Sequence, residues 1–222
     1  MAKKFDLIIF DLDGTLFDSG EAITNSFRYA IKAENLRDLT DEEIKTLLGP
    51  PLETTIRKYY PELEDERVYG MMRTYRKYYK DVELLKSPLF PGMKEVLEKL
   101  KNDGFKIALA TYKLIDCVLP LFEHYDIKKY FDSLRGSIDG KYYTKNEIID
   151  MAISDCKVTD NKRICMIGDT EHDFKGAIQR EIYFIGMTYG FGYKDMTEEE
   201  KNYDKFLGYC DEPIEILKKV EV

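Results

Sequence analysis

The residues best suited to chemistry begin where the first apolar segment ends. Leu7 to Phe10 leads directly into Asp11 and Asp13, which are separated by one leucine. The apolar run is rich in β-branched and aromatic residues and precedes a Gly-Thr turn signal, so it predicts a buried strand. Side chains at i and i+2 of an extended chain point the same way, so both carboxylates are expected to emerge together. At ~5 to 6 Å their charges would repel by on the order of 3 kcal/mol, which calls for a compensating charge nearby.

A second segment repeats this pattern later in the chain. The apolar run Ile164 to Ile167 is followed by a glycine and Asp169, and Asp173 comes four positions further on. Parallel strands of one sheet end at the same edge, so Asp169, and with it Asp173, is expected to converge on the first acidic pair. A hard divalent cation with oxygen ligands, most naturally Mg²⁺ with several waters, would balance these charges. Each fragment alone also fits a solvated turn or a helix start, but the two together favour a site.

The elements that would position these acids alternate along most of the chain. Strands are expected at 5–10, 105–110, 131–134, 163–167 and 182–187, and helices at 93–102, 114–125, 145–156 and 174–180. Alternating strands and helices of these lengths predict right-handed βαβ units and an α/β fold with a doubly wound, Rossmann-like parallel sheet. Ligands of such sheets bind beyond the carboxyl ends of the strands, where the two acidic segments lie.

Residues 18–86 interrupt this alternation. Helix-like segments follow one another without a strand at 21–33, 41–48, 52–60 and 65–80. Thr40 followed by Glu43 predicts a capping box at the start of the second of these helices. We therefore expect residues 1–17 and 87–222 to form an α/β catalytic core. We expect residues 18–86 to form an inserted all-helical cap that begins at the rim of the site.

The composition argues against several other classes of function. The chain has 222 residues and a net charge of −8, which disfavours binding to nucleic acid. No stretch approaches the roughly 18 consecutive apolar residues of a membrane span, and the N-terminus lacks the apolar block of a secretion signal. Four scattered cysteines and two histidines disfavour a zinc site and predict thiols in a reducing, cytoplasmic compartment. Nothing in the sequence indicates an oligomeric state.

Four segments of the chain resemble the motifs of one enzyme superfamily. DLDGTLFDS at 11–19 resembles the first motif of the haloacid dehalogenase superfamily, and GDTEHD at 168–173 resembles its fourth. Two weaker motifs match at Thr111, which ends the second expected strand, and at Lys145, which opens the helix in TKNEIIDMA. Most members are magnesium-dependent phosphohydrolases, and those with a small α-helical cap carry it after the first motif. GPPLETTIR at 49–57 resembles the cap loop of phosphoglycolate phosphatase-like members.

The resemblance and the chemistry of phosphoryl transfer together imply roles for the carboxylates. Asp11 is expected to attack phosphorus and to form an aspartyl phosphate. Asp13 is expected to protonate the leaving oxygen and then to deprotonate the attacking water. The family pattern implies Mg²⁺ bound by Asp11, by Asp169 and by the backbone carbonyl of Asp13, with Asp173 in the outer shell.

The remaining site residues are expected to bind phosphate or the leaving group. Thr111 would offer a hydroxyl to a phosphoryl oxygen, and Lys145 would offer a point charge to the nucleophile and the phosphate. Their residue types alone also fit a helix N-cap and a solvated lysine. Lys113 and Lys141 compete with Lys145 for the lysine role, and the match over the following helix favours Lys145.

Two further residues are predicted to bind substrate. Tyr112 stands where relatives usually carry a small Ser or Asn, so the shape of the phosphate pocket differs there and a backbone amide would serve the phosphate. Arg57 in the insertion is a candidate for recognising an anionic leaving group, against the alternative of an ordinary surface arginine.

The leading function is hydrolysis of a phosphate monoester, with a small phosphorylated metabolite as the substrate, as in phosphoglycolate phosphatase-like or nucleotidase-like enzymes. A phosphosugar mutase of the same superfamily uses the same four motifs and cap, so it stays open. A dehalogenase is disfavoured because those relatives lack the second acid, which is present here as Asp13. A phospho-accepting receiver domain also places carboxylates and Mg²⁺ on a doubly wound sheet, but it has no long helical insertion after its first strand.

Overall fold

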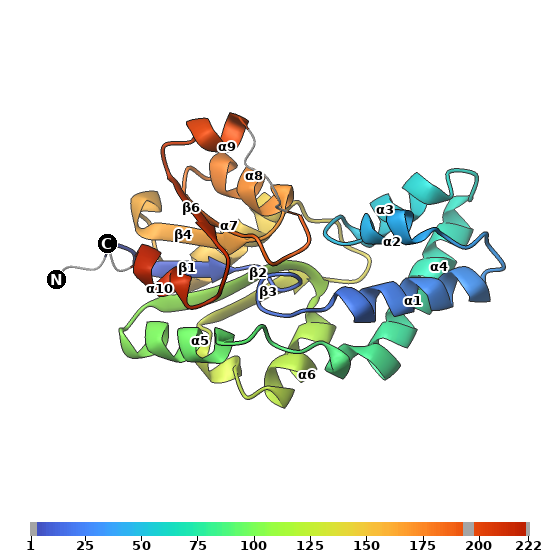
Figure 1. The fold of residues 1–222 in the computed structure, drawn as a ribbon, viewed down its shortest axis with the longest axis horizontal. Coiled ribbons are helices and arrows are strands. Elements are labelled where there is room, and N and C mark those ends of the chain that lie inside the picture. The colour runs from blue at the N-terminus through green and yellow to red at the C-terminus, as the bar shows by residue number, and fades with distance from the viewer. Residues whose placement is uncertain (1–3, 193–197, 221–222) are drawn as a thin grey trace. The chain divides into compact units, whose positions relative to one another are not determined.

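The computed structural model describes residues 4–192 and 198–220 (Figure 1). The chain divides into two compact units. One is an α/β unit made of Met1–Asp18 and Leu89–Val222, and the other is a helical unit made of Ser19–Pro88. The helical unit therefore interrupts the α/β unit shortly after its first strand.

The α/β unit is built on a parallel sheet of six strands in the order β3-β2-β1-β4-β5-β6. The strands are β1 (Leu7–Phe10), β2 (Lys106–Leu114), β3 (Ser133–Ser137), β4 (Ile164–Gly168), β5 (Tyr183–Met187) and β6 (Phe206–Cys210). From β1 the chain first builds outward to β3 and then continues on the other side from β4 to β6. This order confirms the predicted doubly wound α/β fold and places its switch point between β1 and β4.

Helices cover both faces of this sheet. They are α5 (Met93–Asn102), α6 (Ile115–His124), α7 (Lys145–Cys156), α8 (Glu171–Gln179), α9 (Glu198–Asn202) and α10 (Glu215–Val220), with short 3₁₀ turns at Lys128–Tyr130 and Asn161–Arg163. Figure 1 shows α5 and α6 on one side of the sheet and α7 and α8 on the other. All four residues of β1 are fully buried, and Leu7 and Ile9 pack against Ile149 of α7 and Phe174 of α8 in one apolar layer. The buried central strand is thus sandwiched as its apolar sequence predicts.

Several of the observed elements differ from the predicted ones. Strand β6 and helix α10 are additional, and β6 is a half-buried edge strand with Gly208 at φ +90°, so its apolar pattern is weak. Strand β2 extends to Leu114, into the segment expected to begin a helix, with a register shift against β3 between Ala110 and Leu114. Helix α8 begins at Glu171 rather than at residue 174.

The helical unit contains α1 (Gly20–Ala33), α2 (Asp41–Lys45), α3 (Leu52–Tyr59) and α4 (Asp65–Tyr78), followed by a π-helical turn (Tyr79–Glu83) and a 3₁₀ turn (Leu84–Lys86). The predicted capping box is present at α2, where Thr40 accepts from the Glu43 N–H and the Glu43 carboxylate accepts from the Thr40 N–H. The core of the helical unit is formed by buried side chains from α1, α3 and α4: Phe27, Ile31, Ile56, Val68 and Met71.

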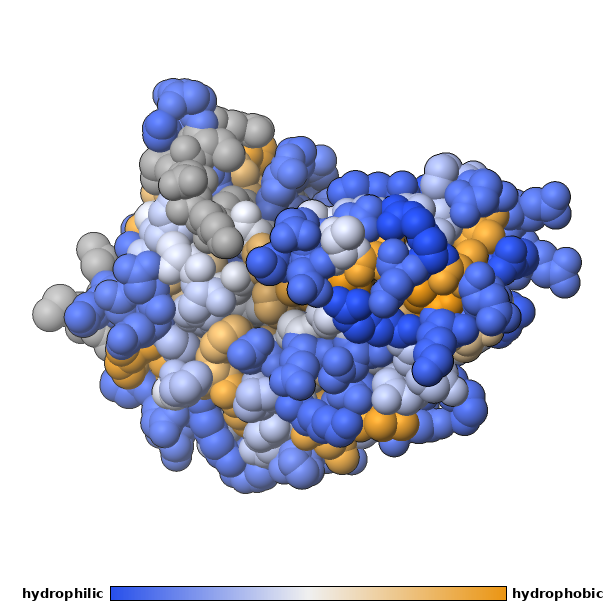
Figure 2. Space-filling view, turned by 45° about the vertical axis from the view of Figure 1, so that its right-hand side comes forward, coloured by the Kyte–Doolittle hydropathy of each residue, from blue (hydrophilic) through white to orange (hydrophobic). Residues whose placement is uncertain are grey.

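Figure 2 shows a face that is mostly hydrophilic, with hydrophobic residues in separate small patches. Among the residues that the structure describes, none of the helices combines the length and the hydropathy that a membrane crossing requires.

Candidate active site

Three buried carboxylates meet at the carboxyl ends of β1 and β4. Asp11 follows β1, Asp169 follows β4 and Asp173 lies in the first turn of α8, and one oxygen of each lies within 4.8 Å of the other two. β1 and β4 pair in parallel with Phe10 opposite Ile167, so the two strands end at the same level. We refer to Asp11, Asp169 and Asp173 as the acidic cluster.

Lys145 is the positive charge within the acidic cluster. Its Nζ lies 2.5 Å from Asp11 Oδ1 and 2.6 Å from Asp173 Oδ1, and its side chain is only 5% exposed. The second oxygen of Asp173 accepts hydrogen bonds from the backbone and the hydroxyl of Thr170, at 3.0 and 2.7 Å. Asp173 therefore both caps α8 and pairs with the lysine. The sequence predicted only that it would lie in the outer shell of a bound Mg²⁺.

Burial makes the ionisation of this group costly. If all three carboxyl groups were ionised, the Lys145 ammonium would leave two negative charges in excess. Burial raises the pKa of Asp11 to about 7, although the Lys145 ammonium lowers it, and burial with the two neighbouring acids raises the pKa of Asp169 well above its usual range. Burial alone would lower the pKa of Lys145, but Asp11 and Asp173 outweigh this effect and raise it. A divalent cation would neutralise the excess charge, and an all-oxygen donor set suits a hard ion such as Mg²⁺.

Asp169 is held in place by groups from two other segments of the chain. Its Oδ1 accepts from the Thr15 hydroxyl at 2.9 Å and its Oδ2 accepts from the Phe191 N–H at 2.7 Å. A Cβ at Gly14 or at Gly190 would lie 2.1 or 2.3 Å from the Asp169 side chain, so only glycine fits at either position. Thr15 was not singled out from the sequence, although the Gly-Thr pair that contains it was noted as a turn signal.

Asp13 is separate from the acidic cluster. Its Oδ1 lies 2.9 Å from the Nζ of Lys113, whose side chain is 8% exposed. β1 ends at Phe10, and Asp13 already lies in a turn, where it forms an isolated bridge with Phe17. The charge of Asp13 still acts on Asp11 and contributes to the raised pKa of that carboxyl. Lys145 thus pairs with Asp11, and Lys113 pairs with Asp13.

The other predicted site residues are distributed between the two units. Thr111 is buried within β2, and its hydroxyl accepts from the Lys113 N–H at 3.2 Å, so it is not a helix N-cap. The phenol oxygen of Tyr112 accepts from the Lys145 N–H at 3.0 Å. Arg57 belongs to α3 of the helical unit, where its Nη2 lies 2.8 Å from both Glu53 and Asp65.

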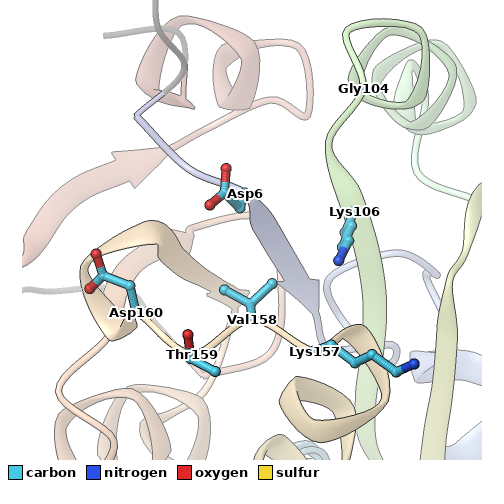
Figure 3. Close-up of a pocket in the computed structure, with 7 residues that line it drawn as sticks. All are labelled: Asp6, Gly104, Lys106, Lys157, Val158, Thr159 and Asp160. Atoms are coloured by element: carbon cyan, nitrogen blue, oxygen red, sulfur yellow. The ribbon is translucent and has the colours of Figure 1, made fainter.

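The α/β unit has a pocket that lies away from the acidic cluster. A pocket of about 270 Å³ opens at the amino ends of β1, β2 and β4 (Figure 3). Its walls include Asp6, Lys106, Thr159 and Asp160, and none of the residues of the acidic cluster takes part. The chemistry and the pocket therefore lie at opposite ends of the same strands.

Comparison with known proteins agrees with this geometry. Residues 8–187 match the model of the haloacid dehalogenase-like hydrolases, and the chain therefore belongs to that family. The chain is 30% identical over 195 residues to a 5'-nucleotidase of Pseudomonas aeruginosa, with 87% of each chain covered. It is 27% identical over 223 residues to a phosphoglycolate phosphatase of Salmonella typhi, with 90% of this chain and 88% of the relative covered. The solved structure of protein tyrosine kinase A of Mycobacterium tuberculosis is 25% identical, covers 100% of both chains and has a TM-score of 0.82.

These matches confirm the resemblance predicted from the four motifs. They also confirm the predicted enzyme class, a haloacid dehalogenase-like phosphatase, at the level of the family and of its phosphatase members.

Proposed function

We propose that this protein is a Mg²⁺-dependent phosphate monoester hydrolase that acts on a small phosphorylated metabolite through an aspartyl phosphate on Asp11. The observation that carries the proposal is the buried acidic cluster with Lys145 2.5 Å from Asp11. A site that only stabilised the fold would not need three buried carboxyl groups around one ammonium at the carboxyl ends of central strands, where sheets of this type bind ligands. The phosphatase relatives support the same reaction class.

Asp11 is the proposed nucleophile. One of its oxygens forms a bond to phosphorus while the bond from phosphorus to the leaving oxygen breaks, which splits hydrolysis into two displacements. Lys145 attracts the phosphoryl oxygens and favours the ionised form of Asp11, as its effect on the Asp11 pKa indicates. A bound Mg²⁺ would be held by Asp11, Asp169 and the Asp13 carbonyl and would supply further charge neutralisation at the phosphoryl group.

Asp13 is the proposed general acid and base. It gives a proton to the leaving oxygen in the first displacement and takes one from the attacking water in the second. Its contact with Lys113 fixes the carboxylate beside the acidic cluster without making it part of that cluster. Thr111, which is buried one residue before Tyr112 on β2, is the proposed hydroxyl donor to a phosphoryl oxygen.

The helical unit is the proposed cap, and Arg57 is its proposed contact to an anionic leaving group. The guanidinium of Arg57 is already bound by Glu53 and Asp65, which raise its pKa. An anionic leaving group would therefore have to compete with these two carboxylates. Arg57→Gln would raise the KM for substrates with an anionic leaving group and leave unchanged the KM for an aryl phosphate without a second anionic group.

The direct test is release of inorganic phosphate from p-nitrophenyl phosphate with Mg²⁺ and with a chelator in its place. Asp11→Asn should remove activity, and Asp6→Asn, at the other end of β1, should leave it intact. Full activity in Asp11→Asn would contradict the covalent mechanism. A panel of phosphoglycolate, nucleoside monophosphates and hexose phosphates would then identify the substrate class. Hydrolysis would be contradicted if the phosphate were not released but were found on an isomer of the substrate or on a tyrosine of a protein.

A further inference from the structure

Tyr112 contacts Lys145 at both its backbone and its ammonium. Its phenol oxygen accepts a hydrogen bond from the Lys145 N–H at 3.0 Å, and the centre of its ring lies 5.5 Å from Lys145 Nζ. Lys145 is the first residue of α7, and the first N–H groups of a helix have no acceptor within the helix. The phenol thus supplies an acceptor for this helix start from a strand 33 residues away in sequence.

The position of Tyr112 on β2 explains why it faces α7. Alternate residues of a strand share a face, and Ala108 and Ala110 lie in the apolar layer between the sheet and α7. Tyr112 continues this series and packs against the same layer. The register of β2 against β3 is irregular between Ala110 and Leu114, and such irregularities change the direction of side chains at the end of a strand.

Helix α8 confines the same lysine from another element. A Cβ at Gly176 would lie 3.2 Å from Lys145 Cγ and 2.8 Å from Ile149 Cδ1, so the lysine stem packs directly against the glycine backbone. His172 of α8 meets the Tyr112 ring edge-on, with ring centres 5.7 Å apart at 83°. The stem and the head group of Lys145 are therefore constrained by both β2 and α8.

We propose that Tyr112 is a positioning residue that holds Lys145, through the backbone N–H and the aromatic ring, where its ammonium meets both Asp11 and Asp173. This inference rests on the proposed function, because the partner of the lysine is the proposed nucleophile. It assigns Tyr112 a role other than the substrate contact expected from the sequence, since its phenol oxygen already accepts from the protein backbone. A small Ser or Asn at this position could not reach the start of α7 in the same way.

The first test is Tyr112→Phe, which keeps the ring and removes the acceptor. The matched control is Tyr143→Phe, because Tyr143 is also half-buried and packs against the same apolar layer. Tyr112→Phe should speed hydrogen exchange at the Lys145 amide by about tenfold, and the control should leave it unchanged. With p-nitrophenyl phosphate, Tyr112→Phe should lower kcat by about five- to tenfold with less than a twofold change in KM.

A double-mutant cycle with Lys145→Met separates positioning from a general structural role. If Tyr112 acts through the lysine, Tyr112→Phe should cause no further loss in the residual kcat of Lys145→Met. The same five- to tenfold loss in both backgrounds, or unchanged exchange at the Lys145 amide, would overturn the proposal. Absence of phosphatase activity in the wild type would instead count against the proposed function, while the exchange measurement would still decide the role of Tyr112.

Discussion

Strand β1 has an acid beside each of its ends, and the two acids are in opposite situations. At the amino end, Asp6 pairs with Arg163, and the two side chains are 45% and 37% exposed. At the carboxyl end, Asp11 pairs with Lys145, and the side chains are 10% and 5% exposed. Both are close ion pairs, but only the second lies within a group of buried carboxyl groups, the acidic cluster. An ion pair as such does not indicate a site, whereas buried charge that the protein does not fully compensate does.

A pocket of the α/β unit lies at the amino end of the sheet, away from the acidic cluster. The pocket in Figure 3 is beside Asp6 at the amino end of the sheet, and its charged walls are mostly exposed. Water screens charges there, so they contribute little to stability and impose little chemistry. Residue types and burial, and not this pocket, locate the candidate site.

The largest expected difference is in the stability of variants that lose the cation of each pair. Lys145→Met leaves buried carboxylates without their partner and should lower the free energy of unfolding by about 3 to 5 kcal/mol. Arg163→Met removes the cation from an exposed pair and should cost less than about 1 kcal/mol. Urea denaturation at neutral pH without divalent cations measures both. Equal losses would contradict the contrast between the two ends of β1.

Binding of a divalent cation should be confined to the carboxyl end. Mg²⁺ at a hundred times its dissociation constant should stabilise the protein by about 2.7 kcal/mol, and a chelator should reverse the effect. Asp169→Asn should abolish this stabilisation, and Asp160→Asn, in the wall of the pocket, should preserve it. Thermal denaturation with and without Mg²⁺ provides the measurement. Stabilisation that survives in Asp169→Asn would place the cation elsewhere.

The pH dependence of stability should also originate at the carboxyl end. The pKa of Asp11 is raised to about 7, so the folded state binds a proton that the unfolded state releases above a pKa of 3.8. Stability without a cation should therefore fall as pH rises, by about 2 to 3 kcal/mol between pH 5 and pH 8. Asp169, whose pKa is also raised, likewise lowers stability as the pH rises. His172, whose pKa is lowered by burial, has the opposite effect and favours the folded state as the pH rises.

The variant Asp11→Asn isolates the contribution of Asp11 to this pH dependence. Urea denaturation of the cation-free protein at both pH values should show a clearly smaller fall in Asp11→Asn than in the wild type. Asp6→Asn should retain the wild-type fall. A fall of the same size in Asp11→Asn would show that the Asp11 carboxyl titrates normally in the folded state.

The smallest effect is expected from the hydroxyl that holds Asp169. Thr15→Val removes the donor to Asp169 Oδ1 and should cost about 1 to 2 kcal/mol of stability and about tenfold in Mg²⁺ affinity. Thr159→Val, at the exposed pocket, should change neither quantity. Titration calorimetry with Mg²⁺ compares the two variants, and equal affinities would exclude a supporting role for Thr15.

Much of the fold follows from local patterns in the sequence. The fully apolar run before Asp11 and the Thr40 capping box at α2 are local signals, and the structure has the corresponding strand and helix. Strand β6 was not predicted because its half-buried residues and Gly208 give no clear period. Strand β2 continues past Ala110 because pairing with β3 resumes at Leu114, which is a tertiary effect.

The site was partly predictable for a related reason. Strand order brings Asp11 and Asp169 to one edge, so their meeting could be expected from the topology. The resemblance to the family also implied that Lys145 serves the nucleophile, and its Nζ contacts Asp11. The pairing of Asp13 with Lys113 could not be expected, because Asp13 lies in a turn after β1. The contact of Tyr112 with the start of α7 likewise depends on the irregular end of β2.

The central claim is that Asp11 accepts a phosphoryl group. The most direct test is the intact mass of Asp13→Asn after acid quenching of a reaction with Mg²⁺ and an aryl phosphate whose leaving group needs no protonation. Without Asp13 to activate water, the phosphorylated protein should accumulate, with the mass of one phosphoryl group added per chain. The double variant Asp11→Asn with Asp13→Asn should gain no mass. A phosphoryl adduct that persists in the double variant would contradict the assignment of Asp11.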